Sequence, residues 1–336
     1  MPPRRLSISL PWNPRNARAL LDRARVADDT GVETIWINEG FGHDAFSGLT
    51  LLAWETMHAR LGTSIVNVYS RTPGALAQHF ATLDQLSNGR VIVGLGTSGP
   101  GVVERFHGMR FQPSLQRLRD VVTLIRAFWR HDRVTHHGAW FDLDRAVVLG
   151  VDPVQAEPPI FLATLHPRSV RLTAEVADGW LPAWIPIDRL ADQIAQLRTW
   201  AREAGRDPAA LTVRAPGSVT VVDNPARAEA VREARRRQLA FFVARNGDFY
   251  YRQFLRHGHA VEAAAIRRAW NEGGPAAGTA EVGDALAERF DFAGSTEACI
   301  DRIEEQAAAG VDLHQVMVAS DEPAVWRRAL ERLIGA

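Results

Sequence analysis

Residues 60–108, RLGTSIVNVYSRTPGALAQHFATLDQLSNGRVIVGLGTSGPGVVERFHG, decide the expected fold. Segments 61–68 and 91–96 are apolar and β-branched enough to be strands that are buried on both faces. Between them, Pro73 suits the first turn of a helix whose apolar residues recur at three- and four-residue steps. We therefore predict a strand–helix–strand unit of a parallel sheet. Ligands of such sheets bind beyond the carboxyl ends of the strands, here at 64–70 and 96–101.

The same alternation of strands and helices continues along the whole chain. Eight strands are predicted, at 6–10, 34–37, 61–68, 91–96, 160–164, 179–183, 212–222 and 313–319. Helical patterns separate them, which favours an α/β fold of the (β/α)8 TIM-barrel type. No composition break marks a linker, so we predict a single domain over 1–336. Two insertions are expected, at about 97–158 and 223–295, and the second is mostly helical.

Composition limits the partners and the compartment. Lys and Arg total 39 and Asp and Glu total 39, so no overall charge favours nucleic acid or an anionic membrane. No apolar run approaches the roughly 18 residues of a membrane span. We expect a cytoplasmic protein that binds neither nucleic acid nor membrane. The lone Cys299 cannot form an internal disulfide, and its helical context favours a core residue.

The chain contains no lysine, so its 39 Lys and Arg residues are all arginine. Schiff-base chemistry and P-loop ATP hydrolysis need a lysine that guanidinium cannot replace. These classes of enzyme are therefore excluded. Any bound phosphate must be held by backbone N–H groups, hydroxyls or arginine.

Residues 94–99, GLGTSG, match the G-x-G-x-x-G pattern of dinucleotide-binding folds. The context argues against that interpretation, because Pro100 follows and the match falls on the fourth strand rather than the first. Asp120, at about the distance of a ribose-binding acid, is also expected inside an amphipathic helix rather than at a strand end. The histidine pairs at 136–137 and 257–259 lack a matching set of carboxylates or cysteines. No metal site is expected.

Four motifs together resemble one known family. They are R-x-P after the third strand, LS-x-GR before the fourth, GLGTSGP after it, and A-E-x-A-D-G-W at 174–180. With segments 159–184 and 293–319, they resemble the bacterial-luciferase-like flavin and deazaflavin oxidoreductases, especially the branch that uses coenzyme F420. The resemblance implies a (β/α)8 barrel and hydride transfer between F420 and an unidentified small organic substrate. The alternative within the same family is an FMN-dependent monooxygenase that works with a separate flavin reductase. A homodimer is expected in either case.

The resemblance also implies where the cofactor would bind. A cis peptide at Ser64-Ile65 would lie behind the ring, the amide of Asn67 at the ring edge, and a helix N-terminus at the phosphate. The implied cofactor-binding residues are Ser64, Ile65, Asn67, Gly96, Thr97, Ser98, Ala163, Thr164, Arg168 and Trp180. From the residues alone, Ser64 and Thr164 are equally well strand-end hydroxyls, Asn67 a turn cap, and Arg71 an ion-pair anchor of its loop.

The loop at 38–44, NEGFGHD, follows the second strand and carries three titratable side chains. Glu39 is the first candidate for proton transfer, and His43 and Asp44 compete with it. Asp44 is also expected to cap a helix that begins near Ala45. Glu104 and His107 are predicted to contact the substrate. Sugar-oxidising relatives carry a Glu where this chain has Gly99, which argues against glucose-phosphate oxidation.

Overall fold

The computed structural model describes residues 3–112 and 114–335, and these form two compact units. The first contains Met1–Ser7, Leu165–Pro167 and Leu181–Ala336. The second contains Ile8–Thr164 and Arg168–Trp180. Every residue predicted for the site falls in the second unit. The single-domain organisation stays a prediction.

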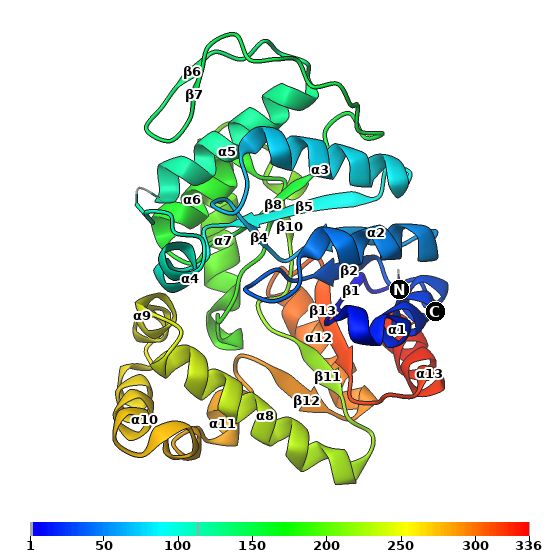
Figure 1. Cartoon of the computed structure of the whole chain (residues 1–336). Helices are drawn as coiled ribbons and strands as arrows, with labels where there is room; N and C mark the ends of the chain where they lie inside the picture. The colour runs from blue at the N-terminus through cyan, green and yellow to red at the C-terminus, as the bar shows by residue number, and fades with distance from the viewer. Residues whose placement is uncertain (1–2, 113, 336) are drawn as a thin grey trace. The chain divides into compact units, whose positions relative to one another are not determined.

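The second unit is built on a parallel sheet (Figure 1). Its neighbouring strands are β9 (Gly179–Trp180), β8 (Ile160–Ala163), β5 (Val91–Gly96), β3 (Arg60–Thr63) and β2 (Thr34–Ile37), and β4 (Val66–Asn67) also pairs with β5. The strands are buried along most of their length, as their apolar runs predict. A Cβ at Gly62 would lie 2.2 Å from the ring of Trp36, so only glycine leaves room for that buried indole.

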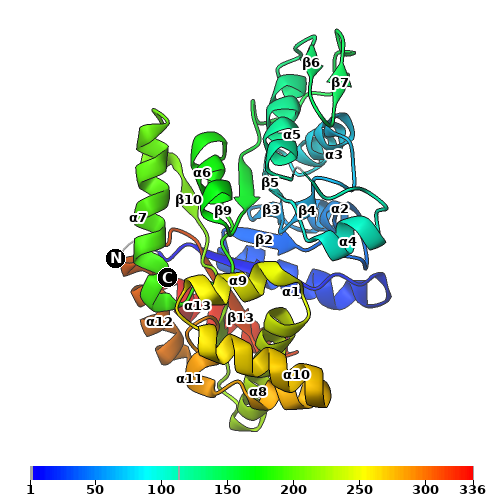
Figure 2. The ribbon, with the colours of Figure 1, turned by 90° about the vertical axis from the view of Figure 1, so that its left-hand side faces the viewer.

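Five helices of this unit precede β8 along the chain. They are α1 (Ala17–Thr30), α2 (Ala45–Glu55), α3 (Pro73–Leu86), α4 (Pro100–Arg105) and α5 (Ser114–Trp129). Thr72 caps α3 and Pro73 opens it, and Gly31 ends α1 in the left-handed conformation. Helix α6 (Pro167–Val176) follows β8. The antiparallel hairpin of β6 (His136–His137) and β7 (Asp142–Leu143) lies beside α5 (Figure 2).

The first unit contains a second set of parallel strands. Strand β13 (His314–Val318) pairs with β11 (Val219–Val221) and with the start of β1 (Leu6–Ser9), through Leu6 and Ser7. A (β/α)8 barrel, as predicted, requires this pairing of the last strand with the first. Strand β12 (Phe292–Gly294) pairs with β11. Strand β10 (Thr212–Val213) comes just before β11 along the chain. Helices α7 (Ile187–Glu203), α12 (Thr296–Ala308) and α13 (Pro323–Ile334) belong to the same unit.

The predicted helical insertion is present as four helices that form a group of their own (Figure 1). They are α8 (Pro225–Ala244), α9 (Asp248–Arg256), α10 (Ala260–Ala280) and α11 (Asp284–Ala287). Their core gathers Trp184, Phe254 and Phe290 with aliphatic residues of α8 and α10. Trp184, which precedes the insertion along the chain, is thus buried in this core.

Two strand predictions need correction. Segment 212–222 is not one strand, because residues 214–218 interrupt it between β10 and β11. There, a Cβ at Gly217 would lie 1.9 Å from the carbonyl oxygen of Phe290, so the chain turns where it meets that backbone. Strand β12 was not predicted, because its three residues are too few for a periodic signal. No helix among the described residues is long and apolar enough to cross a membrane.

Candidate active site

The third predicted strand is divided at its carboxyl end, where the cofactor ring is expected. The peptide Ser64-Ile65 is cis, as predicted, and separates β3 from β4. The end of β2 holds this segment from one side, because Ser64 N–H donates to Ile37 O at 2.9 Å and Glu39 N–H to Ile65 O at 3.3 Å. The backbone around the cis bond is therefore anchored to the loop that carries Glu39.

Three predicted cofactor residues lie in register across neighbouring strands. Asn67 of β4 pairs with Gly96 of β5, and Gly96 pairs with Ala163 of β8. A Cβ at Gly96 would lie 3.3 Å from the Ala163 methyl and from two side-chain carbons of Ile65. Small or absent side chains at Gly96 and Ala163 thus leave a low floor at the strand ends, closed on one side by Ile65.

Asn67 connects this floor with a residue that was predicted to contact substrate. Its side chain is 2% exposed, and Nδ2 lies 3.1 Å from His107 Nε2. Its Oδ1 accepts the N–H of Tyr69 at 2.9 Å, and its carbonyl oxygen accepts the N–H of Ser70. Asn67 therefore caps a turn, as the residues alone allowed, and also brings His107 to the strand ends.

Glu39 is held by a two-point ion pair with Arg71. Arg71 donates to Oε1 of Glu39 at 2.5 Å and to Oε2 at 3.0 Å, and the N–H of Ala45 donates to Oε2 at 2.9 Å. The two side chains are 9% and 19% exposed. Arg71 thus anchors its loop through an ion pair. Glu39 can contact a substrate either from this bonded position or after one of these hydrogen bonds is exchanged.

The other two candidates on this loop have different surroundings. Asp44 is the N-cap of α2, since its carboxylate accepts the N–H of Ser47 at 2.9 Å, and α2 begins at Ala45 as predicted. Partial burial by itself raises the pKa of Asp44, but the hydrogen bonds from Ser47 and the charge of Arg71 bring that pKa below its ordinary value. His43 is exposed, with its ring edge-on to Trp12 at 6.1 Å.

Polar groups of the predicted phosphate region are partly engaged within the protein. The hydroxyl of Thr164 lies 2.7 Å from that of Thr173, and the carbonyl oxygen of Thr164 accepts the indole N–H of Trp180 at 3.1 Å. Trp180 is buried and its N–H is used by this bond. Arg168 is exposed in the first turn of α6, where a helix N-terminus favours an anion.

The remaining predicted residues line the segment after β5. Thr97 donates its hydroxyl to the carbonyl oxygen of Ser98 at 3.3 Å, and Ser98 has φ of 55°. Glu104 is exposed on α4 and has no hydrogen-bond partner among the described residues. The structure thus brings together Asn67 and His107, whereas Glu104 makes no bond to either.

Arg117 of α5, which was not among the predicted site residues, supports this region. Arg117 is 4% exposed and donates through Nε to Val68 O at 2.8 Å. Its guanidinium lies over Tyr69 at 4.5 Å and over Trp140 and Phe141 of the hairpin, each at 4.9 Å. Burial raises the pKa of Tyr69 to about 12, although the charge of Arg117 opposes this. A signal was available, because Arg117 falls in the apolar stripe that continues at 121, 124 and 128.

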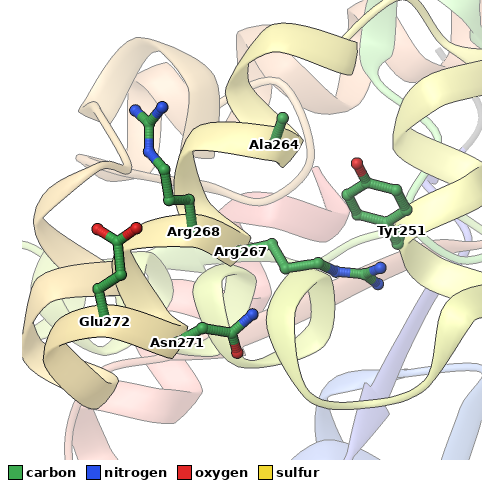
Figure 3. Close-up of a pocket in the computed structure, with 6 residues that line it drawn as sticks. All are labelled: Tyr251, Ala264, Arg267, Arg268, Asn271 and Glu272. Carbon is green, nitrogen blue, oxygen red and sulfur yellow. The ribbon is translucent and has the colours of Figure 1, made fainter.

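A separate pocket of about 360 Å³ lies on the insertion (Figure 3). Six residues of α9 and α10 line it: Tyr251, Ala264, Arg267, Arg268, Asn271 and Glu272. The guanidinium of Arg267 lies 3.5 Å from the centre of the Tyr251 ring and pairs with Asp248. None of the predicted site residues lines this pocket, and its own polar groups include both signs of charge.

Comparison with known proteins agrees with the predicted resemblance. The profile of the family described as luciferase-like monooxygenase matches residues 5–313. Over 295 residues the chain is 30% identical to the 5,10-methylenetetrahydromethanopterin reductase of Archaeoglobus fulgidus, and the match covers 85% of each protein. It is 37% identical over 182 residues to a Mycobacterium tuberculosis protein provisionally named a coenzyme F420-dependent oxidoreductase. This second match covers 51% of the chain, which spans about half (52%) of that relative.

The fold agrees as well. The solved structure of the coenzyme F420 dependent tetrahydromethanopterin reductase from Methanopyrus kandleri matches with a TM-score of 0.81 and 25% identity, over 98% of this chain and 97% of that one. The predicted fold class, a luciferase-like (β/α)8 barrel with insertions, is thereby confirmed. The chain belongs to the luciferase-like monooxygenase family.

Proposed function

We propose that this protein is an oxidoreductase that transfers a hydride between coenzyme F420 and a small organic substrate. One observation carries the proposal: Asn67, Gly96 and Ala163 lie in register at the carboxyl ends of β4, β5 and β8. A low floor bordered by Ile65 suits one face of a flat tricyclic ring, and the Asn67 amide suits its polar edge. The names of relatives from Mycobacterium tuberculosis and Methanopyrus kandleri support F420 as the ring.

The residues fit the rest of such a cofactor. Ser64, Thr97 and Ser98 lie on the chain segments that follow β3 and β5, and Arg168 with the N-terminus of α6 would hold a phosphate. When bound, the deazaflavin supplies the two-electron hydride chemistry. The protein would hold the ring and the substrate in contact, exclude water and move one proton. Thr164 and Trp180 would shape the pocket, since each already uses polar groups inside the protein.

Glu39 remains our candidate for proton transfer, and Glu104 and His107 remain the candidates for substrate contact. The carboxylate of Glu39 follows β2 and is anchored by Arg71 and by Ala45 N–H. Such an anchor fixes the carboxylate, which positioned proton transfer needs. His43 and Asp44 are weaker candidates, because Asp44 caps α2 and His43 is exposed.

Fluorescence titration of the full chain tests this function. Binding of F420 should quench tryptophan emission at lower concentration than binding of FMN. The variant Gly96→Leu should lose F420 binding, because its side chain would occupy the floor between Ile65 and Ala163. Gly101→Ala is the matched control, since a Cβ there meets no atom within 4 Å. Equal F420 binding by both variants would contradict the proposed position of the ring.

An FMN-dependent monooxygenase is the second candidate function, and the name of the matching family supports it. That enzyme would need a separate flavin reductase to supply reduced FMN. Tighter binding of FMN than of F420, or oxygen-dependent product formation with reduced FMN, would favour this candidate. A cytoplasmic location stays a prediction in either case.

The predicted homodimer also belongs to this proposal. Helices α2 and α3 carry exposed apolar side chains, among them Leu51, Trp54 (75% exposed) and Leu86. A pocket of about 240 Å³ between these helices is lined partly by Phe46, Leu83 and Leu86. An apolar patch of this kind favours a protein partner, and a second copy would cover it on both chains. Light scattering should give a dimer for the native chain and a smaller mass for Trp54→Glu.

A further inference from the structure

The amide of Asn67 can be oriented from its hydrogen bonds. A backbone N–H can only donate, so the atom that faces the N–H of Tyr69 at 2.9 Å must be the carbonyl oxygen Oδ1. The NH₂ group then faces His107, with Nδ2 3.1 Å from Nε2. Tyr69 cannot easily shift, because its ring is 4% exposed and stacks on Phe111.

This orientation determines which nitrogen of His107 carries a hydrogen. Nδ2 of Asn67 has only hydrogens to offer, so Nε2 of His107 must accept, and the neutral ring carries its hydrogen on Nδ1. Nδ1 has no hydrogen-bond partner among the described residues, and His107 is partly exposed. Asn67 therefore selects this tautomer of the ring and leaves Nδ1–H as a donor without a partner among the described residues.

We infer that His107 contacts the substrate as a neutral hydrogen-bond donor through Nδ1–H, with Asn67 as its positioning residue. The inference rests on the proposed function and narrows its substrate class. A donor at the reacting carbon suits an oxygen that gains negative charge as hydride arrives, as in an aldehyde or ketone. His107 keeps its proton, so the proton that balances hydride transfer comes from water or from another side chain. Nε2, the one ring nitrogen that can accept a proton, already accepts a hydrogen bond from Asn67. His107 is therefore excluded as the general base.

Nitrogen NMR of the full chain labelled with ¹⁵N-histidine tests the tautomer without any cofactor. At neutral pH, His107 should show protonated Nδ1 and unprotonated Nε2, assigned by the signals that disappear in His107→Gln. Asn67→Asp replaces the donor by an acceptor and should move the hydrogen to Nε2. Asn271→Asp adds the same charge on the exposed surface of α10 and should leave the tautomer unchanged. A hydrogen on Nε2 in the native chain would overturn the inference.

Kinetics test the substrate contact after the titration has established F420 binding. With pre-reduced F420 and a panel of aldehydes and ketones, His107→Leu should lower kcat about 10²–10³-fold, the usual cost of one such donor. His107→Gln retains an N–H donor and should lose less, and neither variant should change F420 affinity. No turnover of any carbonyl, or equal turnover by His107→Leu, would overturn the substrate assignment. Failure of F420 binding would instead overturn the proposed function and leave the tautomer result intact.

Discussion

At the carboxyl ends of β2 and β4, side chains are held by directed hydrogen bonds, whereas helices α8–α11 are held by apolar and aromatic contacts. Glu39 receives three donors, and Asn67 uses both ends of its amide. In the insertion, the ring of Phe254 lies 4.5 Å from that of Phe290 and 6.3 Å from that of Trp184. The first arrangement depends on which atoms are present, and the second on how much volume is filled.

This difference predicts where substitutions will act. A hydrogen bond to a charged group is lost when one atom changes, even if the shape is retained. An aromatic core tolerates changes of similar volume and loses free energy mainly when a cavity opens. Conservative variants should therefore impair activity at the strand ends, and truncations should impair stability in the insertion.

Glu39→Gln should give the largest effect. The substitution keeps the shape and the acceptor for Ala45 N–H but removes the charge that pairs with Arg71. If Glu39 moves the proton, single-turnover rates with saturating F420 should fall about 10²–10⁴-fold. The affinity for F420 should stay within a few-fold, because the proposed ring floor lies on other strands.

Arg71→Met is the control for this experiment. It keeps the carboxylate and its bond from Ala45 N–H and removes the ion pair, so the rate should fall less than in Glu39→Gln. Equal losses of rate in the two variants, with equal losses of melting temperature, would show that the pair only anchors the loop. Glu39 would then leave the mechanism.

Phe254→Ala should give the largest loss of stability in the insertion. The ring is fully buried, and truncation leaves a cavity beside Phe290. Phenylalanine-to-alanine changes in cores cost about 3–5 kcal/mol in the free energy of unfolding, measurable by urea denaturation. Phe249→Ala on the same helix is the control, because Phe249 is 42% exposed and should cost little. Similar losses in both would contradict a core at Phe254.

Much of the fold could be predicted from periodicity. Helix α3 opens at Pro73 as expected, because proline fixes its own φ near the helical value. Strand β12 could not be predicted, because three residues are too few for a periodic signal. The break between β10 and β11 could not be predicted either, since it depends on a turn at Gly217 that meets the backbone of Phe290. That contact joins residues about 70 positions apart in the sequence, and no local pattern encodes it.

The site could be predicted only in outline. The motifs indicated the cis peptide at Ser64-Ile65, the strand-end position of Asn67 and the cap at Asp44. They did not indicate the bond from Asn67 to His107 or the role of Arg117, because both depend on which side chains the folded loops bring together. Residue types indicate a chemistry, whereas partners follow from tertiary packing.

His257 should make the insertion sensitive to acid. Burial lowers the pKa of His257 to about 4, with the charge of Arg256 adding to the effect, and Gln253 lies 2.9 Å from its Nε2. The unfolded chain binds the proton near the ordinary pKa of 6.5. The contribution of the neutral His257 to the free energy of unfolding is therefore fully present above pH 6.5 and is lost as the pH drops toward 4. His257→Gln should weaken this dependence in urea unfolding curves at pH 7 and 5. His314, whose pKa burial also lowers to about 4, should account for much of what remains.

Substitution of Asp44 should give the smallest effect of those predicted here. It should lower the free energy of unfolding and leave the activity unchanged. Asp44→Ala removes the acceptor for Ser47 N–H and should cost about 1 kcal/mol in the free energy of unfolding. Asp44→Asn keeps a good capping side chain and loses only the charge, so it should cost less. Neither variant should change the hydride-transfer rate, because Glu39 is the proposed proton-transfer residue.

The pH dependence separates the two contributions of Asp44. Its pKa is lowered in the folded chain, so the stability from its charge is present above the ordinary pKa of 3.8 and is lost as pH falls through the lower folded value. Native protein and Asp44→Asn should therefore differ at pH 6 and converge in strong acid. Melting curves of the two proteins from pH 6 to pH 3 measure this. A constant difference over that range would mean that shape, not charge, makes Asp44 the cap. The strand ends would then resemble the insertion, where volume decides stability.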